Sequence, residues 1–242
     1  MPVIAVAIQK GGVGKTTLTL NLAAILAKKQ KKPVICLDLD PQGTATNYWL
    51  DELVDDQDTT LAIFDGHAPQ GRLVDGVTFI PASIRLAMKE VQGDVARLSA
   101  WAKSQKDSIV LIDCPPNLGR LTTAALLAAQ HCIIPVTPEP AAVEAIDLFA
   151  KTLASAQKQN SALNLLGIIV NALDDRTRVH QFYVEQLQQT FGPKILGLIH
   201  RSVVFPELQH EGKTVTALNE GDRARKEYAT IARNIIKQLG VR

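Results

Sequence analysis

Cysteine is scarce in this chain. Only Cys36, Cys114 and Cys132 occur in 242 residues, and no two of them have the CxxC spacing of a metal or redox site. Each of the three lies in an apolar stretch. We therefore predict three buried free thiols, and neither a disulfide framework nor a thiolate metal site.

Long hydrophobic runs, net charge and aromatic residues are also limited. No apolar run approaches the roughly 20 residues that a membrane-spanning helix needs, and residues 3–8 lead straight into a glycine-rich segment instead of a signal peptide. The sequence therefore predicts a cytoplasmic protein with no membrane partner. The net charge is only +2, so any binding of nucleic acid must depend on a local basic patch. Aromatic residues make up 5% of the chain, which argues against base stacking as a binding mode.

The strongest motif is QKGGVGKTT at residues 9–17, between an apolar run and a helical pattern over residues 18–29. A glycine loop between a strand and a helix binds phosphate, because backbone N–H groups and the helix N-terminus point at one anion. Lys15 would reach the terminal phosphates, and the Thr16 hydroxyl would hold magnesium. The predicted nucleotide-binding residues of this loop are Gly11, Gly12, Val13, Gly14, Lys15, Thr16 and Thr17.

A second lysine departs from the general phosphate-loop pattern. Gln9 stands where that pattern has its first glycine, and Lys10 follows it. The loop resembles the deviant Walker A motif, whose signature is this extra lysine. A second cation near the phosphates stabilises charge that develops during phosphoryl transfer. The resemblance implies that Lys10 does so across a dimer interface, on the partner's nucleotide.

Three aspartates follow apolar runs. Residues 34–37 lead into Asp38 and Asp40, and residues 108–112 lead into Asp113 in the form of a Walker B strand. Ligands of α/β proteins bind at the carboxyl ends of the strands. If residues 34–37 lie beside the first strand, Asp38 and Asp40 face the magnesium and the γ-phosphate. We predict Thr16, Asp38 and Asp113 at the metal and Lys10, Lys15 and Asp40 as catalytic residues.

Apolar strand patterns and helical patterns alternate along the whole chain. This alternation predicts an α/β fold, with a doubly wound, mostly parallel sheet flanked by helices in a single domain over residues 1–242. The strand over residues 165–170 is expected to end at Asn171, whose amide can both donate to and accept from a base edge. Residues 200–207 are expected to form a loop, and residues 222–239 a final helix.

The motifs QKGGVGKTT, DLDPQG, LIDCPP, an Asp-Arg-Thr stretch and HRSVVFPE, in this order, resemble the ParA family of partition ATPases. The resemblance covers nearly the whole chain and maps the family's water-orienting residue onto Asp40. It implies a deviant Walker P-loop NTPase with ATP and Mg²⁺ as cofactors, and it places Asn171 and Pro206 near adenine. The chain resembles the short form without an N-terminal helix-turn-helix domain.

The same resemblance implies how the protein would work. It implies a homodimer that sandwiches ATP, binds DNA non-specifically and hydrolyses ATP slowly until a cargo-bound partner protein stimulates it. The protein would be nucleoid-associated and would position or segregate a plasmid, a chromosome origin or a protein compartment. The DNA-binding candidates are Arg201, Arg223, Arg225 and Lys226, because clustered cations neutralise phosphates.

Two positions depart from the family pattern, and two alternative functions stay open. His200 stands where proline is common, and Thr137 stands where glutamine is frequent. A MinD-like regulator of site placement would use the C-terminal helix as a membrane-surface helix. An iron–sulfur ATPase resembling the nitrogenase reductase would need paired cysteines at a dimer interface, and Cys114 lies beside Asp113.

Overall fold

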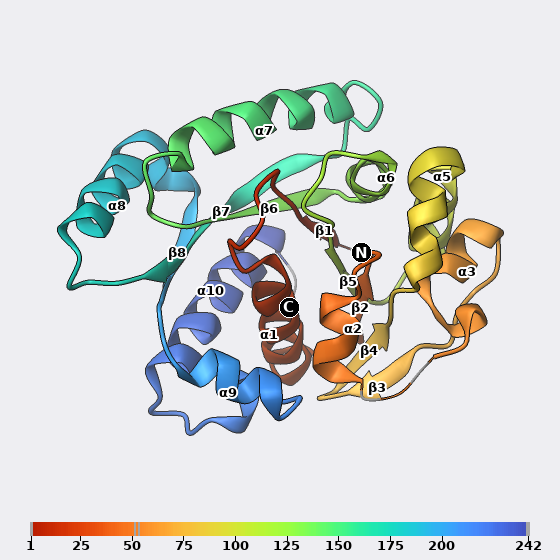
Figure 1. The fold of residues 1–242 in the computed structure, drawn as a ribbon, viewed down its shortest axis with the longest axis horizontal. Helices are drawn as coiled ribbons and strands as arrows, with labels where there is room; N and C mark the ends of the chain where they lie inside the picture. Colours follow the sequence, from red (N-terminus) through yellow and green to blue (C-terminus); the bar gives the residue numbers. More distant parts are fainter. Residues whose placement is uncertain (1, 51, 53, 241–242) are drawn as a thin grey trace.

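A sheet of eight strands runs through the centre of the molecule (Figure 1). This computed structural model describes residues 2–50, 52 and 54–240. Neighbouring strands are parallel except for the antiparallel pair at one edge, β3 and β4. In spatial order the strands are β3 (Arg72–Val74), β4 (Val77–Ile80), β2 (Val34–Asp38), β5 (Ile109–Asp113), β1 (Val3–Val6), β6 (His131–Val136), β7 (Asn164–Leu173) and β8 (Ile195–His200). The predicted doubly wound, mostly parallel sheet is therefore confirmed.

Helices cover both faces of the sheet, because successive strand residues point to opposite sides. Ile4 and Val6 belong to one buried cluster, and Val3 and Ala5 belong to the other. The Ile4 side carries α1 (Lys15–Lys29), α2 (Thr44–Trp49), α9 (Val204–His210) and α10 (Arg223–Leu239). The opposite side carries α3 (Thr60–Asp65), α5 (Ala96–Ser104), α6 (Arg120–Ala128), α7 (Ala142–Gln157) and α8 (Arg178–Phe191). A short helix, α4 (Lys89–Gln92), packs near the start of α6.

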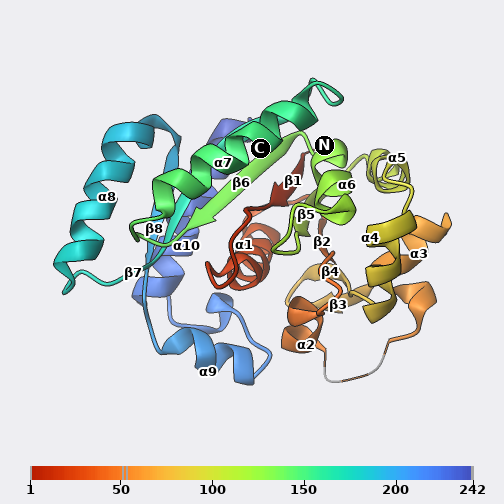
Figure 2. The same ribbon diagram turned by 45° about the horizontal axis from the view of Figure 1, so that its top comes forward.

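Helix α1 occupies the middle of its face. It packs between α10 on one side and α2 on the other, as the tilted view shows (Figure 2). Among the described residues, no helix is long and apolar enough to cross a membrane. Cys36, Cys114 and Cys132 are free and buried, as predicted.

The position of β2 differs from the expectation. It does not pair with β1, because β5 lies between the two strands and pairs with both. The β1–α1–β2 crossover passes over one strand position, which the order of elements along the chain does not reveal. As a result Asp38 and Asp113 become direct neighbours across β2 and β5.

Two further expectations about the second half of the chain were wrong. β7 does not end at Asn171 but continues to Leu173, through an irregularity in its pairing with β8 where Ala172 has φ +56°. Residues 200–207 are not all loop, because α9 begins at Val204. Pro206 fits the first turn of α9, where a missing N–H removes no helical hydrogen bond.

Candidate nucleotide-binding site

The loop from β1 to α1 borders a cavity of about 400 Å³ at the carboxyl ends of the strands. Gly12 and Gly14 have φ of +74° and +81°, a left-handed conformation that favours glycine. The cavity is lined by Gly11, Gly12, Gly14, Lys15, Thr16, Thr17, Asp40, Gln42, Thr44 and Pro116. Val13, predicted with this set, has a buried side chain outside the lining. The loop and the helix N-terminus thus border one cavity, and their contact with phosphate stays a prediction.

Both lysines of the loop contact their own chain. The Lys15 ammonium donates to the Lys10 carbonyl oxygen at 2.8 Å. Burial lowers the pKa of Lys15, against the opposing influence of Asp113, Cys114 and Asp40. The Lys10 ammonium does not line the cavity but donates to Glu139 Oε2 at 2.7 Å and to Thr137 Oγ1 at 3.4 Å. The two lysines therefore point in different directions from one loop.

The predicted metal ligands meet beneath the cradle. Thr16 Oγ1 donates to Asp113 Oδ2 at 2.7 Å, and Asp113 lies beside Asp38 in the sheet. Burial raises the pKa of both carboxyl groups; proximity to Asp38 adds to the rise at Asp113, and the charge of Asp40 adds to that at Asp38. Two buried carboxyl groups with raised pKa values and a hydroxyl suit a hard divalent cation, whose charge favours the ionised acids. The donor set therefore fits magnesium, which when bound offsets negative charge on phosphate oxygens.

Asp38 also holds the segment that follows β2. Its Oδ2 accepts hydrogen bonds from Thr46 N at 2.8 Å and Thr46 Oγ1 at 2.7 Å, and its Oδ1 accepts from Asp40 N at 3.1 Å. Asp40 Oδ1 in turn accepts from Gln42 N at 3.0 Å. Asp40 lines the cavity, whereas Asp38 is fully buried.

The Asn171 side chain reaches the phosphate loop. Its Nδ2 donates to the Val13 carbonyl oxygen at 2.8 Å, and a Cβ on Gly14 would overlap with this amide. Pro206 is exposed on α9. Contact of either residue with adenine therefore stays a prediction.

A second cavity of about 400 Å³ lies at the ends of β7 and β8. Its lining comprises Leu173, Asp174, Asp175, Arg176, His200, Arg201, Ser202, Val203 and Arg223. Arg223 donates to Asp175 at 3.1 Å and to Glu227 at 2.9 Å, and His200 contacts the same two acids at 3.1 and 2.6 Å. Of the four DNA-binding candidates, Arg201 and Arg223 thus lie here, whereas Arg225 and Lys226 line another cavity.

Sequence reasoning missed three residues that support this site. Thr46 bonds Asp38, Glu139 bonds Lys10, and Thr19 Oγ1 lies 3.3 Å from Asp113 Oδ1. Thr19 could have been found, because it lies one helical turn after Lys15 and Thr16. Thr46 carries no comparable signal, since its partner lies on another element. Glu139 follows the carboxyl end of an apolar run, which indicates a place near the crevice, but no pattern links it to Lys10.

Comparison with known proteins identifies relatives of this chain. A family model described as an AAA domain matches residues 1–165. The chromosome-partitioning ATPase Soj of Thermus thermophilus is 35% identical, over 98% of this chain and 96% of that protein. A ParA family protein of Chlamydia muridarum is 31% identical, over 98% of both chains. The chain belongs to the ParA family.

Solved structures agree with the observed fold. The fold matches McdA from Cyanothece with a TM-score of 0.82, at 20% identity over 99% of this chain and all of that one. Cobyrinic acid a,c-diamide synthase from Mycobacterium smegmatis, solved with ADP and magnesium, also has a TM-score of 0.82, at 26% identity over 99% of this chain and 95% of that one. This ParA-family chain is a P-loop ATPase whose cofactors are ATP and Mg²⁺.

Proposed function

We propose that this ParA-family ATPase is a dimeric switch that binds DNA in its ATP state and releases it after hydrolysis. One observation carries the proposal: the Lys10 ammonium lies outside its own phosphate cavity, although Lys10 belongs to the loop that forms it. A lysine placed in this way is available to the nucleotide of a second subunit, where a cation would stabilise the transferring phosphoryl group.

The hydrolytic part of the proposal rests on Asp40, the carboxylate that lines the cavity. Asp40→Ala is expected to retain ATP but to lower turnover by on the order of 100-fold, because a group that orients the attacking water is lost. Phosphate release and ATP binding would be measured side by side. Asp107→Ala is the matched control, since Asp107 is exposed and precedes β5, at the end of that strand away from the cavity. Unchanged hydrolysis in Asp40→Ala would remove Asp40 from the mechanism.

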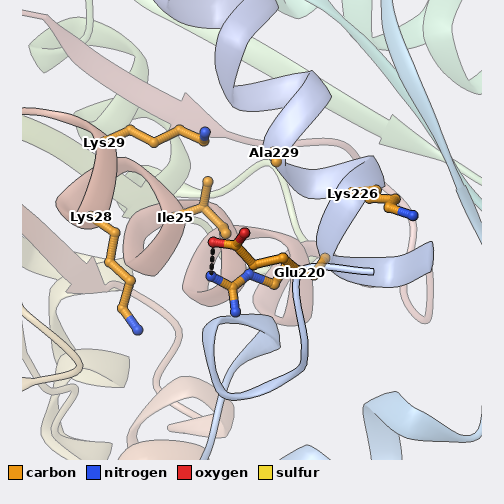
Figure 3. A pocket seen from close by; sticks show the side chains of 7 residues that line it. Ile25, Lys28, Lys29, Glu220, Lys226 and Ala229 are labelled. Atoms are coloured by element: carbon orange, nitrogen blue, oxygen red, sulfur yellow. Dashed lines mark ion pairs between the residues drawn. The ribbon is translucent and has the colours of Figure 1, made fainter. Parts of the chain in front are cut away.

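The basic surface between α1 and α10 supports the DNA-binding part. A cavity of about 340 Å³ is lined by Ile25, Lys28, Lys29, Glu220, Arg225, Lys226 and Ala229. Figure 3 shows Lys28 and Lys29 on one side and Lys226 on the other, with Glu220 between them. Glu220 pairs with Arg225 at 3.5 Å. Lys28 pairs with Asp75 at 3.5 Å, outside the cavity lining. The lining thus holds four cations and one carboxylate, and this excess of positive charge on a concave surface suits a phosphate backbone.

DNA binding is tested by a salt titration with ATP and with ADP. We expect tighter binding with ATP and an affinity that falls steeply with salt, because bound phosphates release counterions. Lys226→Ala is expected to reduce the salt slope by about one, and Lys158→Ala, an exposed lysine after α7, is the control. Equal binding in both nucleotides, or no salt response, would contradict the switch.

The known names of the relatives support cargo partition as the cellular role. Soj of Thermus thermophilus is a chromosome-partitioning ATPase, and we propose that this chain likewise positions or segregates a cargo on the nucleoid. Hydrolysis would be slow alone and faster with a cargo-bound partner protein. The MinD-like alternative is less well supported, because Tyr228, Ile231 and Ile235 on the apolar face of α10 are buried. Binding to anionic liposomes that depends on α10 would favour that alternative.

A further inference from the structure

Glu139 holds the ammonium of Lys10. Glu139 Oε2 lies 2.7 Å from Lys10 Nζ, and the two side chains are 48% and 28% exposed. This hydrogen bond is the main reason why the pKa of Glu139 lies below its usual range. The pair joins two segments that are 129 residues apart, the phosphate loop and the turn after β6.

Two prolines and two backbone hydrogen bonds restrain the turn that carries Glu139. Pro138 and Pro140 flank Glu139, and each fixes its own φ angle. Glu139 N donates to the Thr137 carbonyl oxygen at 2.9 Å, and Ala142 N donates to the Glu139 carbonyl oxygen at 2.9 Å. The backbone of this turn therefore places the Glu139 side chain within reach of Lys10.

A carboxylate in this place competes with phosphate. Both are anions that bind the same ammonium, and a bound carboxylate also offsets the positive charge that would attract a nucleotide. Lys15 is engaged in a similar way by the Lys10 carbonyl, at 2.8 Å. Each lysine of the loop thus has a partner on its own chain that phosphate would have to replace or share.

We infer that Glu139 is a positioning residue that holds Lys10 on its own chain and so opposes formation of the ATP dimer. The inference rests on the proposed function, in which Lys10 acts on the nucleotide of a second copy. Dimer formation draws the ammonium from the carboxylate to the partner's phosphates, and return of Lys10 to Glu139 favours separation. Because the pair is partly exposed, its effect on dimer affinity is moderate.

The test is the dissociation constant of the dimer with Mg²⁺ and a non-hydrolysable ATP analogue, measured by sedimentation. Glu139→Gln is expected to tighten the dimer about 3- to 10-fold, because two contacts are removed per dimer. Glu144→Gln, an exposed glutamate in the first turn of α7, is the matched control and is expected to match the wild type. An unchanged or weaker dimer in Glu139→Gln overturns the inference.

A double substitution separates this contact from general charge effects. In the Lys10→Ala background, Glu139→Gln is expected to leave the sedimentation of the chain unchanged, because the contact that it removes is already absent. If Glu139→Gln promoted dimer formation in the Lys10→Ala background as well, Glu139 would act through something other than Lys10, and the inference would fall.

A second readout uses the free chain and does not need a dimer. The acylation rate of Lys10, followed by mass spectrometry, is expected to rise in Glu139→Gln and to stay unchanged in Glu144→Gln, since the ammonium is released. No rise overturns the inference. If Lys10 is released but neither wild type nor variant dimerises, the proposed function fails; if the wild type dimerises and the variant matches it, the inference alone fails.

Discussion

Asp38 and Asp113 are the most unusual residues of the site. Their carboxyl groups lie on adjacent strands, at equivalent register positions, and both are buried. Thr16 and Thr46 donate to them, yet burial still raises both pKa values. Burial thus raises the pKa of both acids, and the charge of a bound cation would oppose this rise.

These raised pKa values predict a pH dependence for the free chain. An acid whose pKa is higher in the folded state stabilises the fold at low pH, and this contribution is lost as pH rises from about 4 toward the raised value. Asp113→Asn is expected to remove much of this loss. Without nucleotide and Mg²⁺, the free energy of unfolding in urea should exceed that of the wild type at pH 8.5 by on the order of 1 kcal/mol, with a smaller difference at pH 5.

Asp107→Asn is the control for this measurement, because Asp107 is exposed at the opposite end of β5. It should leave the pH dependence of the wild type intact. An Asp113→Asn variant that is less stable than the wild type at both pH values would show that the ionised acid stabilises the free fold.

At the scale of elements, Thr46 joins three segments. Its hydroxyl donates to Asp38 at the end of β2 and accepts from Ala82 N, just after β4, at 2.8 Å, while Thr46 itself belongs to α2. Thr46→Val keeps the side-chain shape but removes both bonds. We expect a loss of about 1 to 3 kcal/mol in the free energy of unfolding, because Ala82 N and Asp38 each lose a partner.

The control for Thr46→Val lies on the same helix. Thr44 is exposed at the start of α2, so Thr44→Val should change the free energy of unfolding by less than about 0.5 kcal/mol. Chemical denaturation of both variants without nucleotide makes the comparison. Equal stabilities would show that water replaces the Thr46 hydroxyl at no cost.

The elements that the sequence predicted well are those with a local signal. The sequence predicted β1, β2 and β5 from their apolar runs, and it predicted the phosphate-binding loop from its glycines. Each of these patterns lies within a few consecutive residues. The short helices α2, α3 and α9 escaped prediction, since six or seven residues are too few to establish a helical period.

Contacts between segments that are far apart in the chain could not be predicted from the sequence. The order β2–β5–β1 and the pair of Lys10 with Glu139 depend on how the sheet is assembled, and no local pattern encodes either. The contact made by Asn171 is a further example. β7 continues past this residue to Leu173, and the Asn171 amide donates to the Val13 carbonyl oxygen on the phosphate loop.

At the scale of the whole molecule, one sheet separates two hydrophobic clusters, so the strands contribute to both. We therefore predict that residues 1–242 unfold as one domain. A ligand bound at the carboxyl ends of β1, β2 and β5 contacts elements that belong to both clusters. Binding at this edge is therefore expected to raise the melting temperature of the whole chain in a single transition.

Dimerisation adds a dependence on protein concentration that simple ligand binding does not have. If the ATP form is a dimer, mass action raises its melting temperature by about 1 to 2 °C for each tenfold increase in protein at saturating Mg²⁺ and non-hydrolysable ATP analogue. With ADP the melting temperature should rise above that of the free chain but stay independent of concentration. Lys10→Ala should behave with the ATP analogue as the wild type behaves with ADP, because the loop still binds phosphate while the contact to a second subunit is lost. The melting temperatures would be measured by scanning calorimetry over a hundredfold range of protein concentration. If the melting temperature rose equally with protein concentration in ADP and in the ATP analogue, dimer formation would not depend on ATP.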